Sequence, residues 1–313
     1  MHKVWFLILA ISILTLFLWQ SLDGKLYWHE VRFLYASTQF TMADTLSGKF
    51  NPHQMGGEID EVGASGFYLA KALHIWTLKQ FFSFFPPASG GFTLASWVSV
   101  MLIMCSAVIV YHIMKKLFDR YVDPLFALYC FILAPVTPYL SGKILSEIPS
   151  LFLILTCIWV FILLTQGKTG PFKIGFVACA VLLTVTAFYR LDVIITYFGF
   201  LISAIVFCPG TLQRKKTIQS GTIVTTLFVM FYFGALHYFY IDPKVIVVYF
   251  KNFYSLEVKS VAMSIFGVIC FGGMVYFLLL VAAFFVKKRE VLFLLSWFIL
   301  TICPMTLITV NYM

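Results

Sequence analysis

Most of the chain consists of long apolar runs separated by short polar segments. One much longer segment, near the start, interrupts this pattern. A run of about 20 apolar residues can cross a bilayer as a helix, because backbone in lipid must satisfy its own hydrogen bonds. We therefore expect an all-α, polytopic membrane protein with about nine transmembrane helices in a single integral membrane domain, residues 1–313. The predicted spans are 4–22, 93–114, 124–140, 144–165, 172–188, 193–208, 217–240, 260–286 and 291–310.

The apolar stretch 172–208 is too long for one span, since a helix of that length measures ~55 Å against a hydrocarbon core of ~30 Å. The sequence Tyr189-Arg190-Leu191-Asp192 interrupts its middle. We predict two short helices, 172–188 and 193–208, arranged as a hairpin that turns at Arg190. The turn is expected at or slightly below the membrane surface.

The interruption near the start, residues 23–92, is predicted to be a large non-cytoplasmic first loop. Its segments 27–42 and 64–85 carry apolar residues at roughly helical spacing, and a Gly- and acid-rich connector lies between them. Both segments are predicted to be amphipathic helices in the membrane interface. The apolar positions of the second are Phe67, Leu69, Ala70, Leu73, Trp76, Leu78, Phe81 and Phe82, with Lys71 and Lys79 between them.

The composition agrees with a membrane protein. Hydrophobic residues make up 61% of the chain, charged residues 11%, and the mean hydropathy is +0.96. An average soluble domain is about 25% charged, so the composition excludes a soluble enzyme, a disordered chain and a nucleic-acid-binding domain. The seven cysteines lie inside apolar runs without a metal-binding spacing, which favours helix packing over a disulfide framework.

The charges predict the orientation. With the N-terminus in the cytoplasm, the inside segments hold 12 of the 22 Lys and Arg residues but only 3 of the 13 acids. The short inside loops are then basic, as the positive-inside rule requires. We expect an integral protein of the bacterial inner (plasma) membrane, or of the ER membrane if the source is eukaryotic.

Ionisable residues beside or within apolar runs are the candidates for function, because charges near lipid usually line a cavity or pair with one another. These candidate residues are predicted on the non-cytoplasmic side of the membrane, at similar depth in the bilayer. Each candidate also has a simpler interpretation, which stays open. Glu30 would be a surface carboxylate, and Lys143 with Glu147 would lie at a solvated helix end. Arg190 with Asp192 would form an internal ion pair that closes the turn.

In their order along residues 5–210, these features resemble the GT-C superfamily of membrane glycosyltransferases, which includes protein O-mannosyltransferases and the aminoarabinose transferase of lipid A. An acidic residue soon after the first span and an amphipathic aromatic segment in a large outer loop are typical of that superfamily. The matching segments are Trp28-His29-Glu30-Val31, residues 67–85, Lys115-Lys116-Leu117-Phe118-Asp119-Arg120, Ser141-Gly142-Lys143 with Ser146-Glu147, and Arg190-Leu191-Asp192.

The resemblance implies transfer of a sugar from a polyprenyl- or dolichyl-phosphate donor to an acceptor hydroxyl of a glycan, lipid or protein, with inversion. Glu30 matches the general base, which takes the acceptor proton. Lys143 and Arg190 match cations that stabilise the departing lipid phosphate. The supporting residues are His29, Glu147 and Asp192.

We expect no cofactor. A divalent metal held by His29, His53, Glu58 and Asp60 is the alternative, but these residues lack the tight spacing of metal ligands. The expectation is therefore no metal site. The partners expected are the lipid-linked sugar, its acceptor and the bilayer, and no nucleic acid.

The chain departs from the family pattern in two respects. Many relatives carry His-Pro-Pro before the second amphipathic segment, where this chain has Gly63-Ala64-Ser65-Gly66-Phe67-Tyr68. Relatives are usually longer, so this chain is expected to be a minimal or a truncated member. A transporter or flippase for a lipid or small solute, and a non-catalytic scaffold, remain the alternative functions; the sequence leaves the sugar and acceptor open.

Overall fold

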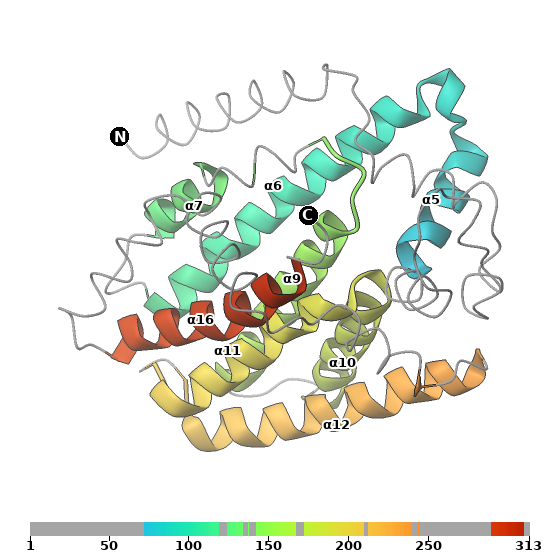
Figure 1. Ribbon diagram of the computed structural model, residues 1–313. Helices are drawn as coiled ribbons and strands as arrows, with labels where there is room; N and C mark the ends of the chain where they lie inside the picture. Colours follow the sequence, from blue (N-terminus) through green and yellow to red (C-terminus); the bar gives the residue numbers. More distant parts are fainter. Residues whose placement is uncertain are drawn as a thin grey trace.

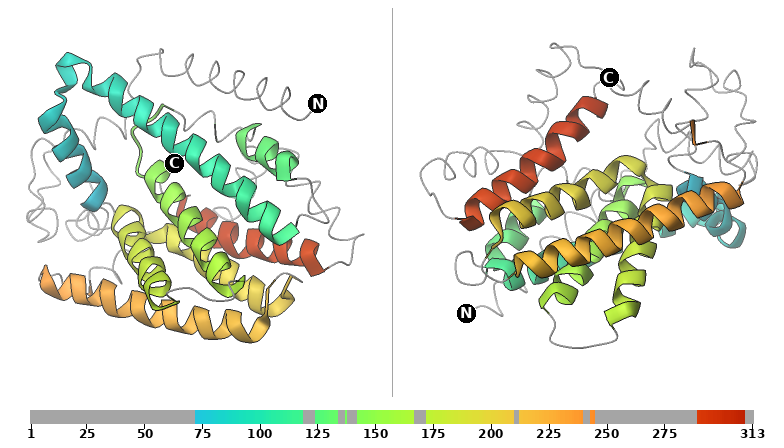
Figure 2. Two further views of the ribbon diagram at one scale, coloured as in Figure 1. Left: turned by 180° about the vertical axis from the view of Figure 1, so that it is seen from behind. Right: turned by 90° about the horizontal axis from the view of Figure 1, so that it is seen from below.

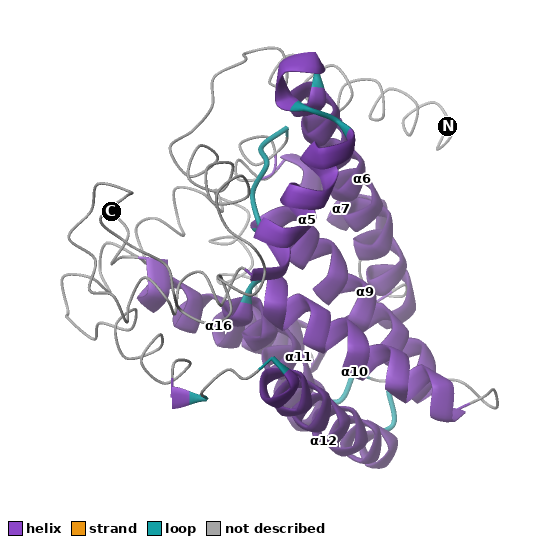
Figure 3. Ribbon diagram, turned by 90° about the vertical axis from the view of Figure 1, so that its right-hand side faces the viewer, coloured by secondary structure: helices purple, strands orange, loops and turns teal. Residues whose placement is uncertain are grey.

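The described part of the protein is entirely helical. The computed structural model describes residues 72–118, 124–133, 137, 142–166, 172–209, 212–239, 243–244 and 289–309. Within these ranges every regular element is a helix and none is a strand (Figure 3). The predicted all-α class is therefore confirmed for the part of the chain that the structure describes.

The described helices begin and end within a few residues of the apolar runs from which they were predicted, except that α7 covers only the first part of the run 124–140. Three of the described helices, α6, α9 and α12, are long and apolar enough to cross a membrane, and two shorter apolar helices cover Ile174–Tyr189 and Leu191–Phe207. The predicted spans 4–22 and 260–286 lie outside the described residues. The α-helices are α5 (Ala72–Phe84), α6 (Gly91–Phe118), α7 (Pro124–Leu133), α9 (Glu147–Gln166), α10 (Phe172–Tyr189), α11 (Ile194–Phe207), α12 (Arg214–Tyr238) and α16 (Arg289–Thr309).

The long helices form a layered bundle. α6 and α9 lie side by side, and α10 packs against both α9 and α12 (Figures 1 and 2). α11 packs mainly along α16, and it also contacts α9 and α12. These contacts bring the start of α9 next to the end of α10.

The break predicted at Arg190 is present, but the two helices beside it are arranged differently from the prediction. α10 ends at Tyr189, a short 3-10 helix covers Leu191–Val193, and α11 begins at Ile194. α10 packs chiefly along α9 and α12, whereas α11 packs chiefly along α16. The two halves therefore diverge from Arg190 instead of packing against each other as a hairpin, because each has more apolar surface to bury on another helix.

α5 lies within the predicted amphipathic segment 64–85, although its buried face differs from the predicted stripe. Ile75, Leu78 and Phe82 are buried, while Trp76 is 40% exposed. A turn through Pro86-Pro87 then leads into α6. Gly90 in this turn has a φ of 91°, a left-handed conformation that glycine adopts without a steric penalty from a Cβ.

An aromatic cluster fixes the positions of α9, α11 and α16. The ring of Phe200 on α11 contacts Phe161 of α9 and Phe293 and Trp297 of α16 at centroid distances of 5.1 to 6.1 Å. All three pairs are edge-to-face, which is a favourable aromatic geometry. The rings hold α11 firmly, and α11 directly follows the Arg190 turn.

Four cysteines of the described residues are free thiols, namely Cys105, Cys157, Cys179 and Cys208. Cys157 of α9 and Cys179 of α10 are fully buried, and each thiol donates to the backbone carbonyl oxygen of the other, at 3.5 and 3.8 Å. These small side chains allow α9 and α10 to approach closely. Cys105 differs, because it is exposed on α6.

Candidate functional site

The candidate site is built around Arg190, the residue at which α10 ends. Its backbone is extended, with φ −167° and ψ 105°, which takes the chain out of the helix. Its amide still donates to the carbonyl oxygen of Thr186 at 2.7 Å, and its own carbonyl accepts from the amide of Val193 at 3.3 Å. The turn is therefore anchored at both ends, and the side chain of Arg190 leaves it from a fixed backbone position.

Asp192 holds the Arg190 guanidinium from within the same turn. The Nε–H group lies 2.8 Å from Oδ1 and 2.9 Å from Oδ2 of Asp192. The Asp192 side chain is 3% exposed, and that of Arg190 is 19% exposed. A buried carboxylate needs such a charged partner, because an unpaired charge in a low-dielectric environment is strongly destabilising.

Glu147, the first residue of α9, is the second partner of Arg190. Its Oε1 accepts a hydrogen bond from Nη1 of Arg190 and forms an ion pair with it. The hydroxyl of Ser146 donates to Oε2 of the same carboxylate at 3.2 Å. A carboxylate in the first turn also interacts favourably with the helix dipole, so Glu147 stabilises the start of α9.

Lys143 belongs to the segment that leads into α9, four positions before Glu147. Its side chain is half-buried. Glu147, Arg190 and Asp192 carry a formal charge of −1 together, so with the positive charge of Lys143 these four described residues are formally neutral. An anion that binds here therefore meets cations whose charge is already balanced by carboxylates.

The helix α5 also reaches this site through residues that the sequence analysis did not single out. The hydroxyl of Thr77 donates to the carbonyl of Leu73 at 2.7 Å, so the Tyr189 hydroxyl is the donor in its 2.8 Å bond to Thr77. The ring of His74, which is 4% exposed, lies 6.2 Å from that of Tyr189. Tyr189 is adjacent to Arg190, so α5 is attached directly beside the charged turn.

Glu147 and Asp192, predicted on the same side of the membrane as Arg190, thus both contact its guanidinium group. The contact matches the alternative in which Arg190 and Asp192 form an internal ion pair, and Glu147 extends that pair. The roles of Lys143 and Arg190 in binding a donor phosphate stay predictions. Glu30 and His29 lie outside the described residues.

A metal site is not formed by the residues that the structure describes, since they include no group of three His, Cys, Asp or Glu able to hold an ion. The alternative metal site of the sequence analysis lies outside the described ranges, since these do not include His29, His53, Glu58 or Asp60.

No family model, no curated protein and no solved structure matches the chain.

Proposed function

We propose that the protein is a GT-C-type membrane glycosyltransferase that transfers a sugar from a polyprenyl-phosphate donor to an acceptor hydroxyl on the non-cytoplasmic face. The observation that carries this proposal is the charged network of Glu147, Arg190 and Asp192 at one end of the helix bundle. Such groups are costly near lipid and typically mark a functional cavity.

The unequal exposure of the two carboxylates supports a specific role for Arg190. Asp192 is almost fully buried, whereas the side chain of Glu147 is 32% exposed. Asp192 is a positioning residue that keeps the guanidinium oriented. Glu147 is the exchangeable partner: a donor phosphate takes its place at Nη1, and the bidentate geometry of a guanidinium suits a phosphate as well as a carboxylate.

The chemical step is a single displacement. The acceptor oxygen attacks the anomeric carbon, the bond from that carbon to the phosphate oxygen breaks, and its electron pair remains on the polyprenyl phosphate. The acceptor proton passes to the carboxylate of Glu30, which the resemblance assigns as general base. Arg190 and Lys143 stabilise the charge that the departing phosphate gains.

The decisive experiment measures donor consumption. Membranes that contain the full chain are incubated with synthetic polyprenyl-phosphate mannose or polyprenyl-phosphate aminoarabinose, radiolabelled in the sugar, and released polyprenyl phosphate is quantified. We expect Glu30→Gln to lower turnover by about 100-fold or more, because a positioned general base contributes about 10² to 10⁴. Arg190→Lys is expected to retain part of the activity, because it preserves the charge but not the bidentate geometry.

The matched control is Glu290→Gln, which removes a carboxylate from the first turn of α16 at the far end of α11. It is expected to keep full turnover. Unchanged turnover in Glu30→Gln, at equal abundance in the membrane, would remove Glu30 as the base. Movement of the labelled donor across liposomes without its consumption would instead identify a flippase and contradict the proposal.

A further inference from the structure

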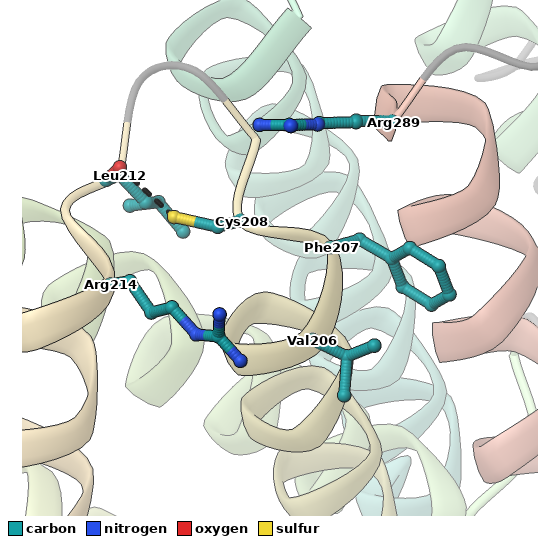
Figure 4. Close-up of a pocket in the computed structure, with 6 residues that line it drawn as sticks. All are labelled: Val206, Phe207, Cys208, Leu212, Arg214 and Arg289. Carbon is teal, nitrogen blue, oxygen red and sulfur yellow. Dashed lines mark hydrogen bonds between the residues drawn. The ribbon is translucent and has the colours of Figure 1, made fainter.

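A second charged region lies at the end of α11 opposite Arg190. A cavity of about 490 Å³ opens there between α11, α12 and α16. α11 has 14 residues and is therefore about 21 Å long, so this cavity is separate from the Arg190 site. Its lining consists of Val206, Phe207, Cys208, Leu212, Arg214 and Arg289 (Figure 4).

The wall contributed by the end of α11, Cys208 and Leu212 is largely apolar. Cys208 has a φ of 40° and ends the helix, and its thiol donates to the carbonyl oxygen of Leu212 at 3.3 Å. The amide of Leu212 in turn donates to the carbonyl of Pro209 at 2.8 Å. Val206 and Phe207 present apolar surface below this turn (Figure 4).

The two arginines come from different helices and extend toward the end of α11 from opposite sides (Figure 4). Arg214 is the first residue of α12, and Arg289 is the first residue of α16. Both are exposed, and the ion pairs of the described residues involve Arg190, not these two. A cation at a helix N-terminus opposes the helix dipole, so neither arginine is favoured at its position by its own helix.

Two groups act against an anion in this cavity. The C-terminal carbonyl groups of α11 carry partial negative charge, and Glu290 adds a carboxylate in the first turn of α16. Two guanidinium groups and the N-terminal ends of α12 and α16, which carry partial positive charge, attract an anion. The cations at this end outnumber the carboxylates in the described residues, so the local potential favours an anion.

We propose that this cavity binds a phosphate group, held by Arg214 and Arg289 from opposite sides. Guanidinium groups bind phosphate oxygens in pairs of parallel hydrogen bonds. The phosphate belongs either to the headgroup of an anionic lipid or to a soluble phosphate. The apolar surface of Val206 and Phe207 suits the glycerol and upper acyl chain of a lipid, and basic pockets between transmembrane helices bind anionic headgroups on the cytoplasmic side.

The test uses the purified full-length chain and three probes: phosphatidylglycerol, phosphatidylcholine as the zwitterionic control, and inorganic phosphate. Native mass spectrometry measures lipid binding, and thermal unfolding measures stabilisation by inorganic phosphate. The test variant is Arg214→Gln with Arg289→Gln. The matched control is Lys116→Gln with Lys215→Gln, which removes two exposed charges from the same predicted face but outside the cavity lining.

We expect phosphatidylglycerol to bind in preference to phosphatidylcholine, and binding to weaken by about tenfold or more in the arginine variant but not in the control. Stabilisation by inorganic phosphate alone, lost in the arginine variant, would assign the site to a soluble phosphate. Equal binding of both lipids and no effect of phosphate, or equal losses in both double variants, would overturn the proposal and leave the arginines as orientation signals.

A second measurement does not depend on the folding of the variants. Phenylglyoxal modifies accessible arginines, and peptide mass spectrometry reports the modified positions in the wild-type chain. Bound phosphatidylglycerol or phosphate is expected to slow modification of Arg214 and Arg289 together. Unprotected modification of both arginines at saturating concentrations of every probe would also overturn the proposal.

Discussion

At the residue scale, the two carboxylates that contact Arg190 have different surroundings and therefore different consequences when they are changed. Asp192 is 3% exposed and shares both its oxygens with Nε of Arg190, whereas Glu147 is 32% exposed. Removing the partner of a buried charge leaves that charge uncompensated, which costs far more than losing an exposed ion pair. The stability of the turn therefore depends mainly on the Arg190–Asp192 pair.

We predict that Arg190→Met lowers the free energy of unfolding by about 3–5 kcal/mol, since it strands the buried Asp192 carboxylate. Glu147→Gln should cost no more than about 1 kcal/mol. Thermal unfolding of the detergent-solubilised chain, followed by size-exclusion chromatography, measures both. The double variant Arg190→Met with Asp192→Asn is expected to be more stable than Arg190→Met alone. A Glu147→Gln cost equal to that of Arg190→Met would contradict this ranking.

At the element scale, the sequence was sufficient to predict where helices form but not which helices pack together. The apolar runs predicted α6, α9, α10, α11, α12 and α16 to within a few residues, because run length and flanking charges are local properties. The divergence of α10 and α11 could not be predicted, since it depends on the shapes of surfaces contributed by distant segments. The same reason applies to the bond between Thr77 and Tyr189, whose residues are separated by 112 positions.

The site was predicted to a similar extent. The placement of charges in and beside apolar runs singled out Glu147, Arg190 and Asp192, which the structure brings into contact. Their pairing, and the different exposure of the two acids, required the packing of α9 against α10. His74 gave a weak signal, as an ionisable residue on an amphipathic segment, but nothing in the sequence linked it to Tyr189.

The packing of α11 on α16 provides a prediction at this scale. A Cβ atom added at Gly199 would lie 3.1 Å from Oγ1 of Thr301 and 3.3 Å from Cβ of Leu300. Gly199→Leu is therefore expected to separate α11 from α16 and to cost about 1–3 kcal/mol through overpacking. The matched control is Gly234→Leu on α12, because nothing outside the local backbone of α12 lies within 4 Å of the Cβ position there.

Thermal unfolding of the two glycine variants in the same detergent compares their stability directly. The prediction requires a lower midpoint for Gly199→Leu than for Gly234→Leu. Equal midpoints would mean that α16 does not pack tightly on α11.

At the scale of the whole molecule, the two charged regions lie at opposite ends of α11. The Glu147–Arg190–Asp192 network precedes this helix, and the cavity of Arg214 and Arg289 follows it. If α11 crosses the bilayer, the two regions face different compartments. The excess of basic residues predicts that the arginine cavity is on the cytoplasmic side.

Cysteine labelling tests this orientation. In a chain whose seven native cysteines are replaced by alanine, single cysteines are introduced by Ser83→Cys on α5 and Lys215→Cys on α12, both exposed positions. A membrane-impermeant maleimide is expected to label Ser83→Cys in intact cells, and Lys215→Cys only after permeabilisation. The reverse pattern would invert the topology and place the Arg190 network in the cytoplasm.

The bond between the hydroxyls of Tyr189 and Thr77 has a consequence for the order in which the protein assembles. It joins two residues that are 112 positions apart in the sequence. The chain between them contains α6, α7, α9 and nearly all of α10. Contacts between residues so distant along the chain form only after the intervening segments have come together, because closing the loop early carries a large entropic cost. We therefore expect the contact between α5 and the Arg190 turn to form late in assembly, after α9 and α10 have packed together.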